Sequence, residues 1–381
     1  MKFFPTAFTF LLSTSAILAA SALGDTQAAG AITLKEAARG KFHVGAAINT
    51  AQITGRDKRG DALLLEQFDS ISPENCLKWE RVHPRPGHYD FALPDAYVKF
   101  GVDHKMFVVG HTLMWHNQTP EWVFKNDKGE AVSKEELLKR LREHIATVVG
   151  RYRGKIGGWD VVNEAIDDNG QLRRDTPWYG ILGEEGVFAA FEAAHQADPD
   201  AELYYNEYSL DNVPKRDAVL KLVKAIRARG LRIDAVGLQE HYLLTEPSAA
   251  AIDGYISAFA NAGFKVMVTE LDVTMLPRPN QYFGADIKQH FERRAELDPY
   301  EKALPADRQQ ALADRYAKVF AIYAKHHANI KRVTLWGVSD AQSWLNDWPI
   351  LHRTDYPLLF DRDYRPKPAF NAAVKALQST Q

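Results

Sequence analysis

Eight short strand-like segments recur along this chain, and segments with helical spacing lie between them. Several are continuous apolar runs, which is typical of parallel strands buried on both faces. Strand and helix alternating on this scale predict an α/β protein, a (β/α)8 TIM barrel in one domain. We predict strands at residues 42–48, 68–73, 106–113, 158–163, 202–205, 235–239, 265–269 and 332–337.

The intervening segments favour helices because apolar residues recur there with a period near 3.6. Examples are residues 137–149, 187–196, 217–229 and 314–327. Gly230 and Gly263 follow two such segments, where glycine is the usual helix stop. The longest connection runs from about residue 272 to residue 313 and contains four prolines, which predicts an elaborated loop. No linker divides residues 31–378, and we expect them to form a single domain.

Residues 1–29 are predicted to be a signal peptide. They begin with a positive charge, residues 8–20 are apolar or small, and Ala22 and Ala29 are candidate cleavage positions. A membrane anchor is the alternative, but the run is short and interrupted by Ser and Thr. The mature chain keeps one cysteine, Cys76, so an internal disulfide is impossible. We expect a secreted or periplasmic protein without membrane contact after signal removal.

Charge and composition narrow the range of partners. The chain has 47 basic and 49 acidic residues, and it therefore lacks the positive surplus that binding to nucleic acid requires. The glycines at residues 154–158 do not have the spacing of a phosphate-binding loop. We therefore expect no nucleic-acid partner and no cofactor, and we expect a monomer. Eight tryptophans provide ample flat surfaces on which a ligand could stack.

Two of the predicted strands run into a glutamate, Glu164 and Glu270, 106 residues apart. Carboxylates are costly to desolvate, so an apolar run usually reaches one where the chain leaves the core. In a TIM barrel the carboxyl ends of the strands share one face. The two acids are therefore predicted to face one another, an arrangement that can split an acetal. For either glutamate alone, a buried ion pair is the alternative.

Polar and aromatic residues follow most of the other predicted strands. They are Glu74, Asn75 and Lys78 after the second, His111, Trp115 and His116 after the third, Asn206 and Glu207 after the fifth, Gln239 and His241 after the sixth, and Trp336 and Asp340 after the eighth. Since the active sites of such barrels lie at these strand ends, we expect this rim to bind a ligand.

The histidines of this rim allow a second interpretation, a zinc site. Against it, they are interspersed with Gln and Trp, and the first strand offers only His43, without a closely spaced pair. We therefore expect no metal. His241 is predicted to orient the carboxylate of Glu270, and His111 to contact the substrate.

Tryptophans near the strand ends fit a sugar ligand. A lone tryptophan is more often a core residue, but Trp115, Trp336 and Trp344 lie near the two predicted acids. The apolar face of a pyranose can pack on an indole while its hydroxyls meet polar side chains. Asn163, directly before Glu164, either caps the following turn or donates to a sugar hydroxyl.

Taken together, these motifs resemble the endo-β-1,4-xylanases of glycoside hydrolase family 10. The similarity runs from about residue 41 to residue 373. Its motifs are PENCLKW (73–79), GHTLMWH (110–116), WDVVNEA (159–165), GLQEHY (237–242), TELD (269–272), WGVSD (336–340), YPLLFD (356–361) and KPAF (367–370).

This resemblance implies a retaining endo-acting hydrolase of xylan and xylooligosaccharides. Glu164 would be the general acid/base, and Glu270 the nucleophile that forms a covalent glycosyl-enzyme. The resemblance also implies ten substrate-binding residues, which are Glu74, Asn75, Lys78, His111, Trp115, Asn163, Gln239, His241, Trp336 and Trp344. The segment 277–304 would shape the leaving-group side. A β-glucan substrate, a metal-dependent hydrolase and a non-catalytic sugar-binding barrel are the alternatives.

Overall fold

The computed structural model describes residues 1–2, 32–279 and 287–379 of the chain. The predicted signal peptide lies almost entirely outside these residues. Within them, eight parallel strands close into a ring in the order β1-β2-β3-β4-β5-β6-β8-β9, and β9 pairs with β1. The strands of the ring are β1 (His43–Ile48), β2 (Ser70–Pro73), β3 (Phe107–Trp115), β4 (Gly158–Asn163), β5 (Glu202–Glu207), β6 (Ala235–Leu238), β8 (Lys265–Thr274) and β9 (Ile330–Leu335). The predicted (β/α)8 barrel is confirmed.

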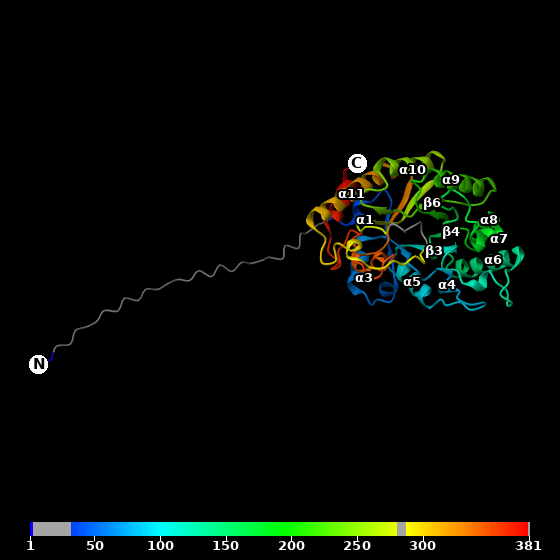
Figure 1. Ribbon diagram of the computed structural model, residues 1–381, viewed down its shortest axis with the longest axis horizontal. Helices are drawn as coiled ribbons and strands as arrows, with labels where there is room; N and C mark the ends of the chain where they lie inside the picture. The colour runs from blue at the N-terminus through cyan, green and yellow to red at the C-terminus, as the bar shows by residue number, and fades with distance from the viewer. Residues whose placement is uncertain (3–31, 280–286, 380–381) are drawn as a thin grey trace. The chain divides into compact units, whose positions relative to one another are not determined.

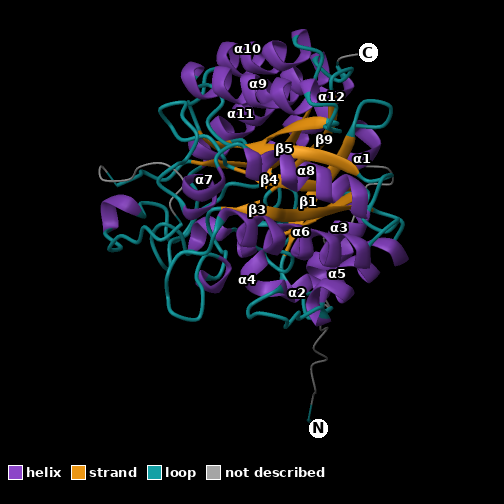
Figure 2. Ribbon diagram, turned by 90° about the vertical axis from the view of Figure 1, so that its right-hand side faces the viewer, coloured by secondary structure: helices purple, strands orange, loops and turns teal. Residues whose placement is uncertain are grey.

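Helices surround this ring of strands. Figures 1 and 2 show α9, α10 and α11 on one side of the strands and α5 and α6 on the opposite side. The helices are α1 (Leu34–Ala37), α2 (Thr50–Ile53), α3 (Lys58–Gln67), α4 (Trp79–Val82), α5 (Ala92–Asp103), α6 (Lys134–Arg151), α7 (Pro177–Leu182), α8 (Glu185–Ala197), α9 (Val213–Ala228), α10 (Ala249–Asn261), α11 (Ala306–Lys325) and α12 (Pro368–Gln378). No helix of the described residues combines the length and the apolar character needed to cross a bilayer.

The helix boundaries follow local chemistry. The hydroxyl of Ser133 caps α6 by accepting from the backbone N–H of Glu136, and the helix then buries an apolar stripe against the barrel. Gly230 and Gly263 lie just beyond α9 and α10 with φ of 73° and 78°. Both predicted helix stops are confirmed, since this conformation is strained for residues with a Cβ atom.

The predicted strand bounds differ from the observed ones mainly at the carboxyl ends. β3 continues to Trp115 and β5 to Glu207. A short strand that we did not predict, β7 (His241–Leu243), pairs with residues Asp272 to Thr274. Because β7 provides these hydrogen-bond partners, β8 runs four residues beyond Glu270. The prediction that the strand ends at Glu270 was therefore wrong, although the glutamate still reaches the rim.

The long connection after β8 is present, as predicted. In its described part, the only helical element before α11 is the 3-10 turn η2 (Ala295–Leu297). Ion pairs brace this part, because Arg293 contacts Asp298 at 2.6 Å and Glu301 at 3.2 Å. The middle of the connection, residues 280–286, lies outside the described residues.

Candidate active site

A cavity of about 680 Å³ lies at the carboxyl ends of the barrel strands. Strand register aligns residues at this end of the barrel, because Trp115, Asn163 and Asn206 stand side by side on β3, β4 and β5. The two predicted acids and the ten predicted substrate-binding residues all line the cavity, namely Glu74, Asn75, Lys78, His111, Trp115, Asn163, Glu164, Gln239, His241, Glu270, Trp336 and Trp344. Of the other predicted rim residues, Glu207 lines the cavity and His116, Asn206 and Asp340 do not. The structure therefore brings the two predicted acids and the predicted substrate-binding residues together in one cavity.

Glu164 follows β4 directly and is buried. Its Oε2 accepts from Trp115 Nε1 at 2.8 Å, and its Oε1 accepts from Gln239 Nε2 at 2.9 Å. His116 lies further away, with Nε2 at 3.9 Å from Oε2. Trp115 is the last residue of β3, and Gln239 directly follows β6. These two donors fix the carboxyl group in the cavity. No arginine or lysine among the described residues forms an ion pair with it. The alternative of a buried ion pair is therefore not observed for Glu164.

Glu270 lies on β8 and is also buried. Its Oε1 accepts from Asn206 Nδ2 at 2.8 Å, and its Oε2 lies 3.2 Å from His241 Nε2. Burial raises the pKa of Glu270, but the hydrogen bond from His241 and the nearby His111 outweigh it, so that the pKa lies below its ordinary value. Glu270 is therefore held as a carboxylate.

A chain of side-chain amides connects the two acids. Asn163 Oδ1 accepts from Gln239 Nε2 at 3.3 Å and from Asn206 Nδ2 at 2.9 Å. The same two amide nitrogens donate to Glu164 and Glu270. The amides of Gln239 and Asn206 therefore both bind Asn163 Oδ1, and each also holds one of the two carboxyl groups. The barrel thus determines the position of the two carboxyl groups relative to one another.

His241 is held in place by a third acid. Its Nδ1 lies 3.0 Å from Asp272 Oδ2, which also accepts from Trp344 Nε1 at 2.8 Å. Burial alone would lower the pKa of His241, but Asp272 and Glu270 raise it to about 10. A protonated His241 donates through both ring nitrogens, one to each carboxylate. The structure therefore places His241 in the contact with Glu270 that its predicted orienting role requires.

His111 is anchored in a similar way, with Nδ1 at 2.9 Å from Asp160 Oδ2. Both side chains are buried. Among the described residues, no three His, Cys, Asp or Glu side chains gather so that they could hold a metal ion. In this site, His111 and His241 are each paired with a carboxylate of the protein.

Glu74, Asn75 and Lys78 form a separate polar group at the end of β2. Asn75 donates to Glu74 Oε1 at 3.1 Å and accepts from Lys78 Nζ at the same distance. Burial raises the pKa of Glu74 and lowers the pKa of Lys78, although neighbouring charges oppose both shifts. Lys78 Nζ also lies 4.9 Å from the ring centroid of Trp115. This group offers donors and acceptors to sugar hydroxyls.

Two indole rings stand around the acids on the β9 side of the cavity. Trp336 meets His111 and His241 edge to face, with ring centroids 5.5 and 6.3 Å apart. Trp344 stacks on Trp348 at 4.6 Å. These aromatic walls next to polar groups have the character of a carbohydrate site.

Three residues that contact the acids or histidines of the site were absent from the twelve predicted site residues, namely Asn206, Asp272 and Asp160. Asn206 was predicted only as part of the polar rim, and the other two lie inside motifs that carry the resemblance. The sequence therefore contained a feature, a predicted strand end or a family motif, that could have pointed to each of them. Their roles depend on partners from distant strands, however, and no local pattern reveals such partners.

Comparison with known proteins agrees with this geometry. Residues 33–376 match the model of glycosyl hydrolase family 10. An endo-1,4-beta-xylanase A of Xylanibacter ruminicola is 47% identical over 90% of this chain and 93% of its own length. A beta-1,4-xylanase of Dictyoglomus thermophilum is 42% identical over 90% of both chains.

A solved structure shares the fold as well. It is a GH10 endoxylanase retrieved from a sugarcane soil metagenome, with a TM-score of 0.86 and 42% identity over 91% of this chain and 99% of its own. The family model covers residues 33–376, and each of these relatives aligns with about 90% of the chain. This chain is therefore a member of glycoside hydrolase family 10.

Proposed function

We propose that this protein is an endo-1,4-β-xylanase that cleaves xylan and xylooligosaccharides with retention of configuration. The observation that carries the proposal is the pair of glutamates joined by amides in one polar and aromatic cavity. Two relatives with near-complete overlap are named as xylanases, which supports the substrate class.

In the first step, Glu270 attacks the anomeric carbon as a carboxylate. Glu164, carrying a proton, gives it to the departing glycosidic oxygen, and the bond to the leaving sugar breaks. The low pKa of Glu270 supports this assignment, because the attacking group must be ionised. Asn206 and His241 hold the carboxylate in place for attack.

In the second step, water attacks the anomeric carbon, and the ester bond between Glu270 and the sugar breaks. Glu164, now ionised, accepts a proton from that water, and the sugar leaves with its original configuration. His111, Lys78 and Asn163 line the cavity, where they would bind the sugar hydroxyls. Contacts of this kind accelerate the reaction only where they tighten in the transition state.

Reducing ends released from xylan and from carboxymethylcellulose test the substrate. We expect release from xylan at a rate at least tenfold higher. A faster release from carboxymethylcellulose would favour a β-glucan as the substrate. Proton NMR of the first product tests the stereochemistry, because a retaining enzyme yields the β-anomer first, and an initial α-anomer would exclude double displacement.

We also propose that residues 1–29 direct export to the periplasm or the medium. The positive start, the apolar stretch and the small residues at the candidate cleavage positions support this proposal. N-terminal sequencing of the exported protein is expected to begin at Leu23 or Gly30. Retention of Met1 on an intracellular product would contradict it.

A further inference from the structure

The backbone of Glu164 has an unusual conformation. Its φ is 56°, in the left-handed region that side chains with a Cβ atom disfavour. Such a conformation persists only where the surroundings hold it. The residues that hold it therefore also determine where the Glu164 carboxyl group points.

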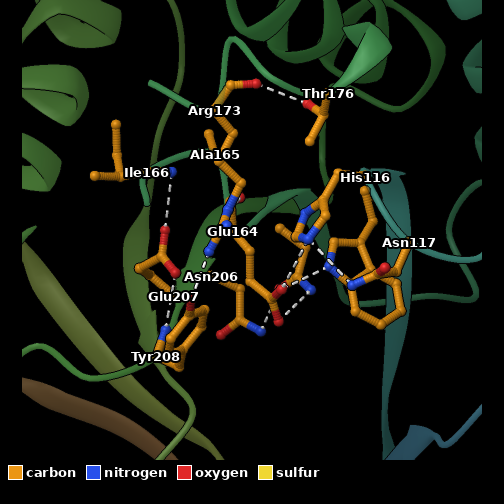
Figure 3. A network of polar contacts seen from close by, with 12 residues as sticks. His116, Asn117, Glu164, Ala165, Ile166, Arg173, Thr176, Asn206, Glu207 and Tyr208 are labelled. Atoms are coloured by element: carbon orange, nitrogen blue, oxygen red, sulfur yellow. Dashed lines mark hydrogen bonds and ion pairs between the residues drawn. The ribbon is translucent and has the colours of Figure 1, made fainter. Parts of the chain in front are cut away.

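Four hydrogen bonds fix the backbone around Glu164. The N–H of Glu164 donates to the carbonyl of Asn206 at 2.9 Å, and the N–H of Ala165 to Tyr205 Oη at 3.1 Å. The N–H of Ile166 donates to Glu207 Oε2 at 3.2 Å. The carbonyl of Glu164 accepts from Arg173 Nε at 3.0 Å. Figure 3 shows Glu164 between these contacts and His116.

Glu207 stands at the centre of this support. Its Oε2 accepts from Ile166 N–H and from Tyr205 Oη at 2.7 Å. Its Oε1 accepts from Tyr208 N–H at 3.1 Å and lies 3.1 Å from Lys215 Nζ. Both members of this ion pair are fully buried. Every contact to Glu207 thus comes from a donor, and an amide could not satisfy them all.

Besides the contacts of Glu207, a second set of contacts supports the backbone of Glu164. Arg173 donates to Glu164 through Nε and to the Tyr208 hydroxyl through Nη2. Lys215 Nζ lies 3.1 Å from the centroid of the Tyr208 ring and 3.0 Å from Asp168 Oδ1. Tyr208 therefore contacts both Glu207, through its N–H, and Arg173, through its hydroxyl.

We propose that the buried pair Glu207–Lys215 is a positioning device that holds Glu164 in the orientation needed for proton transfer. The inference rests on the proposed function, in which Glu164 is the acid and base. A buried ion pair is weak evidence for stability, since apolar residues of similar volume often replace one without loss. The four donors around Glu207 point to a geometric role.

The test is Glu207→Gln, measured on aryl β-xylobiosides with good and poor leaving groups. A good leaving group departs without a proton, whereas a poor one needs the acid. We expect kcat/KM to fall about tenfold or more for the poor leaving group and less than about twofold for the good one, because a displaced acid loses part of its 10²–10⁴-fold contribution. Azide should raise turnover of the good substrate.

A matched control is Lys367→Met. Lys367 and Asp340 form another buried ion pair, with Nζ 2.8 Å from Oδ2, and neither lines the cavity. This variant should lower kcat/KM equally for both substrates. An equal loss in Glu207→Gln, without azide rescue, would overturn the positioning role.

If Glu207→Gln does not fold, Tyr208→Phe decides the question. It keeps the ring and removes only the hydroxyl that accepts from Arg173. A selective loss on the poor leaving group supports the proposal, and an equal or absent loss overturns it. A wild-type protein that cleaves neither xyloside would instead contradict the proposed function, so the two failures are distinguishable.

Discussion

At the residue scale, two glutamates of the same cavity have different surroundings. Glu270 faces His241, which Asp272 keeps protonated, and this positive neighbour holds it as a carboxylate. Glu164 is bound by the neutral donors of Trp115 and Gln239. Different environments of this kind are how one site assigns different roles to two carboxyl groups.

Replacing each glutamate tests these roles. Glu164→Ala should lower activity on xylan about 10²–10⁴-fold, because the leaving oxygen loses its acid. On an aryl xyloside with a good leaving group it should form the glycosyl-enzyme, stall there, and be rescued by azide. Glu270→Ala should lose activity on every substrate.

Steady-state and burst kinetics, with product analysis for a glycosyl azide, check this expectation. Glu143→Ala is a suitable control, because this side chain is 63% exposed on α6. Strong residual turnover in Glu270→Ala would mean that another group attacks the anomeric carbon.

The acid limb of activity should depend on His241. His241 lowers the pKa of Glu270, so His241→Gln should raise the pKa of Glu270. The acid limb of the pH profile of kcat/KM should then move to higher pH by roughly one unit. The pH dependence of xylooligosaccharide hydrolysis measures the shift. His43→Gln is the control, since His43 begins β1 and pairs with Asp69 outside the cavity. An unchanged acid limb in His241→Gln would refute the electrostatic role.

At the element scale, the approach of β3 to β4 requires a glycine next to the site. A Cβ on Gly110 would lie 2.1 Å from Cε3 of the buried Trp159, and Gly110 directly precedes His111. Real side chains do not approach so closely, so the sheet or the indole would have to shift. By contrast, a Cβ on Gly254 of α10 would meet nothing within 4 Å.

Alanine at these two glycines should therefore have opposite effects. We expect Gly110→Ala to destabilise the protein by about 1–3 kcal/mol or more through overpacking. Gly254→Ala should stabilise it by about 0.5–1 kcal/mol, because alanine is the better residue inside a helix. Urea unfolding measures both values. A neutral Gly110→Ala would show that β3 and β4 adjust without cost.

At the scale of the whole molecule, a buried histidine pair makes stability depend on pH. His83 and His144 face one another with Nδ1 atoms 3.2 Å apart, and His144 stacks on Trp79 at 3.6 Å. Burial, with a smaller effect of His88, lowers the pKa of His83 to about 4. Burial and His83 hold the pKa of His144 well below its ordinary value.

Unfolding should consequently become easier as the pH falls below about 6.5. The unfolded chain binds protons at both histidines there, whereas the native protein keeps His83 neutral down to about pH 4. Each such group contributes about 1.4 kcal/mol per pH unit in this window. Chemical unfolding between pH 7 and pH 4 measures the slope. His83→Phe should make it shallower, and an unchanged slope would exclude the pair as its source.

Much of this molecule follows from signals within short windows of sequence. The apolar runs, the helical periods and the glycines at 230 and 263 determine where elements begin and end. The two glutamates that close apolar runs indicate a shared rim, because parallel strands of a barrel direct their carboxyl ends to one face. These features are local, and therefore readable in the chain itself.

Only the tertiary structure decided which groups meet at each carboxylate. Asn206 lies on β5, and Gln239 and His241 follow β6, and the arrangement of the strands brings them to Glu164 and Glu270. The pairing of β7 with β8 and the contact of Glu207 with the backbone of Ile166 are likewise long-range. These hydrogen bonds join residues 29 to 75 positions apart, and no short window of sequence contains both partners of such a contact.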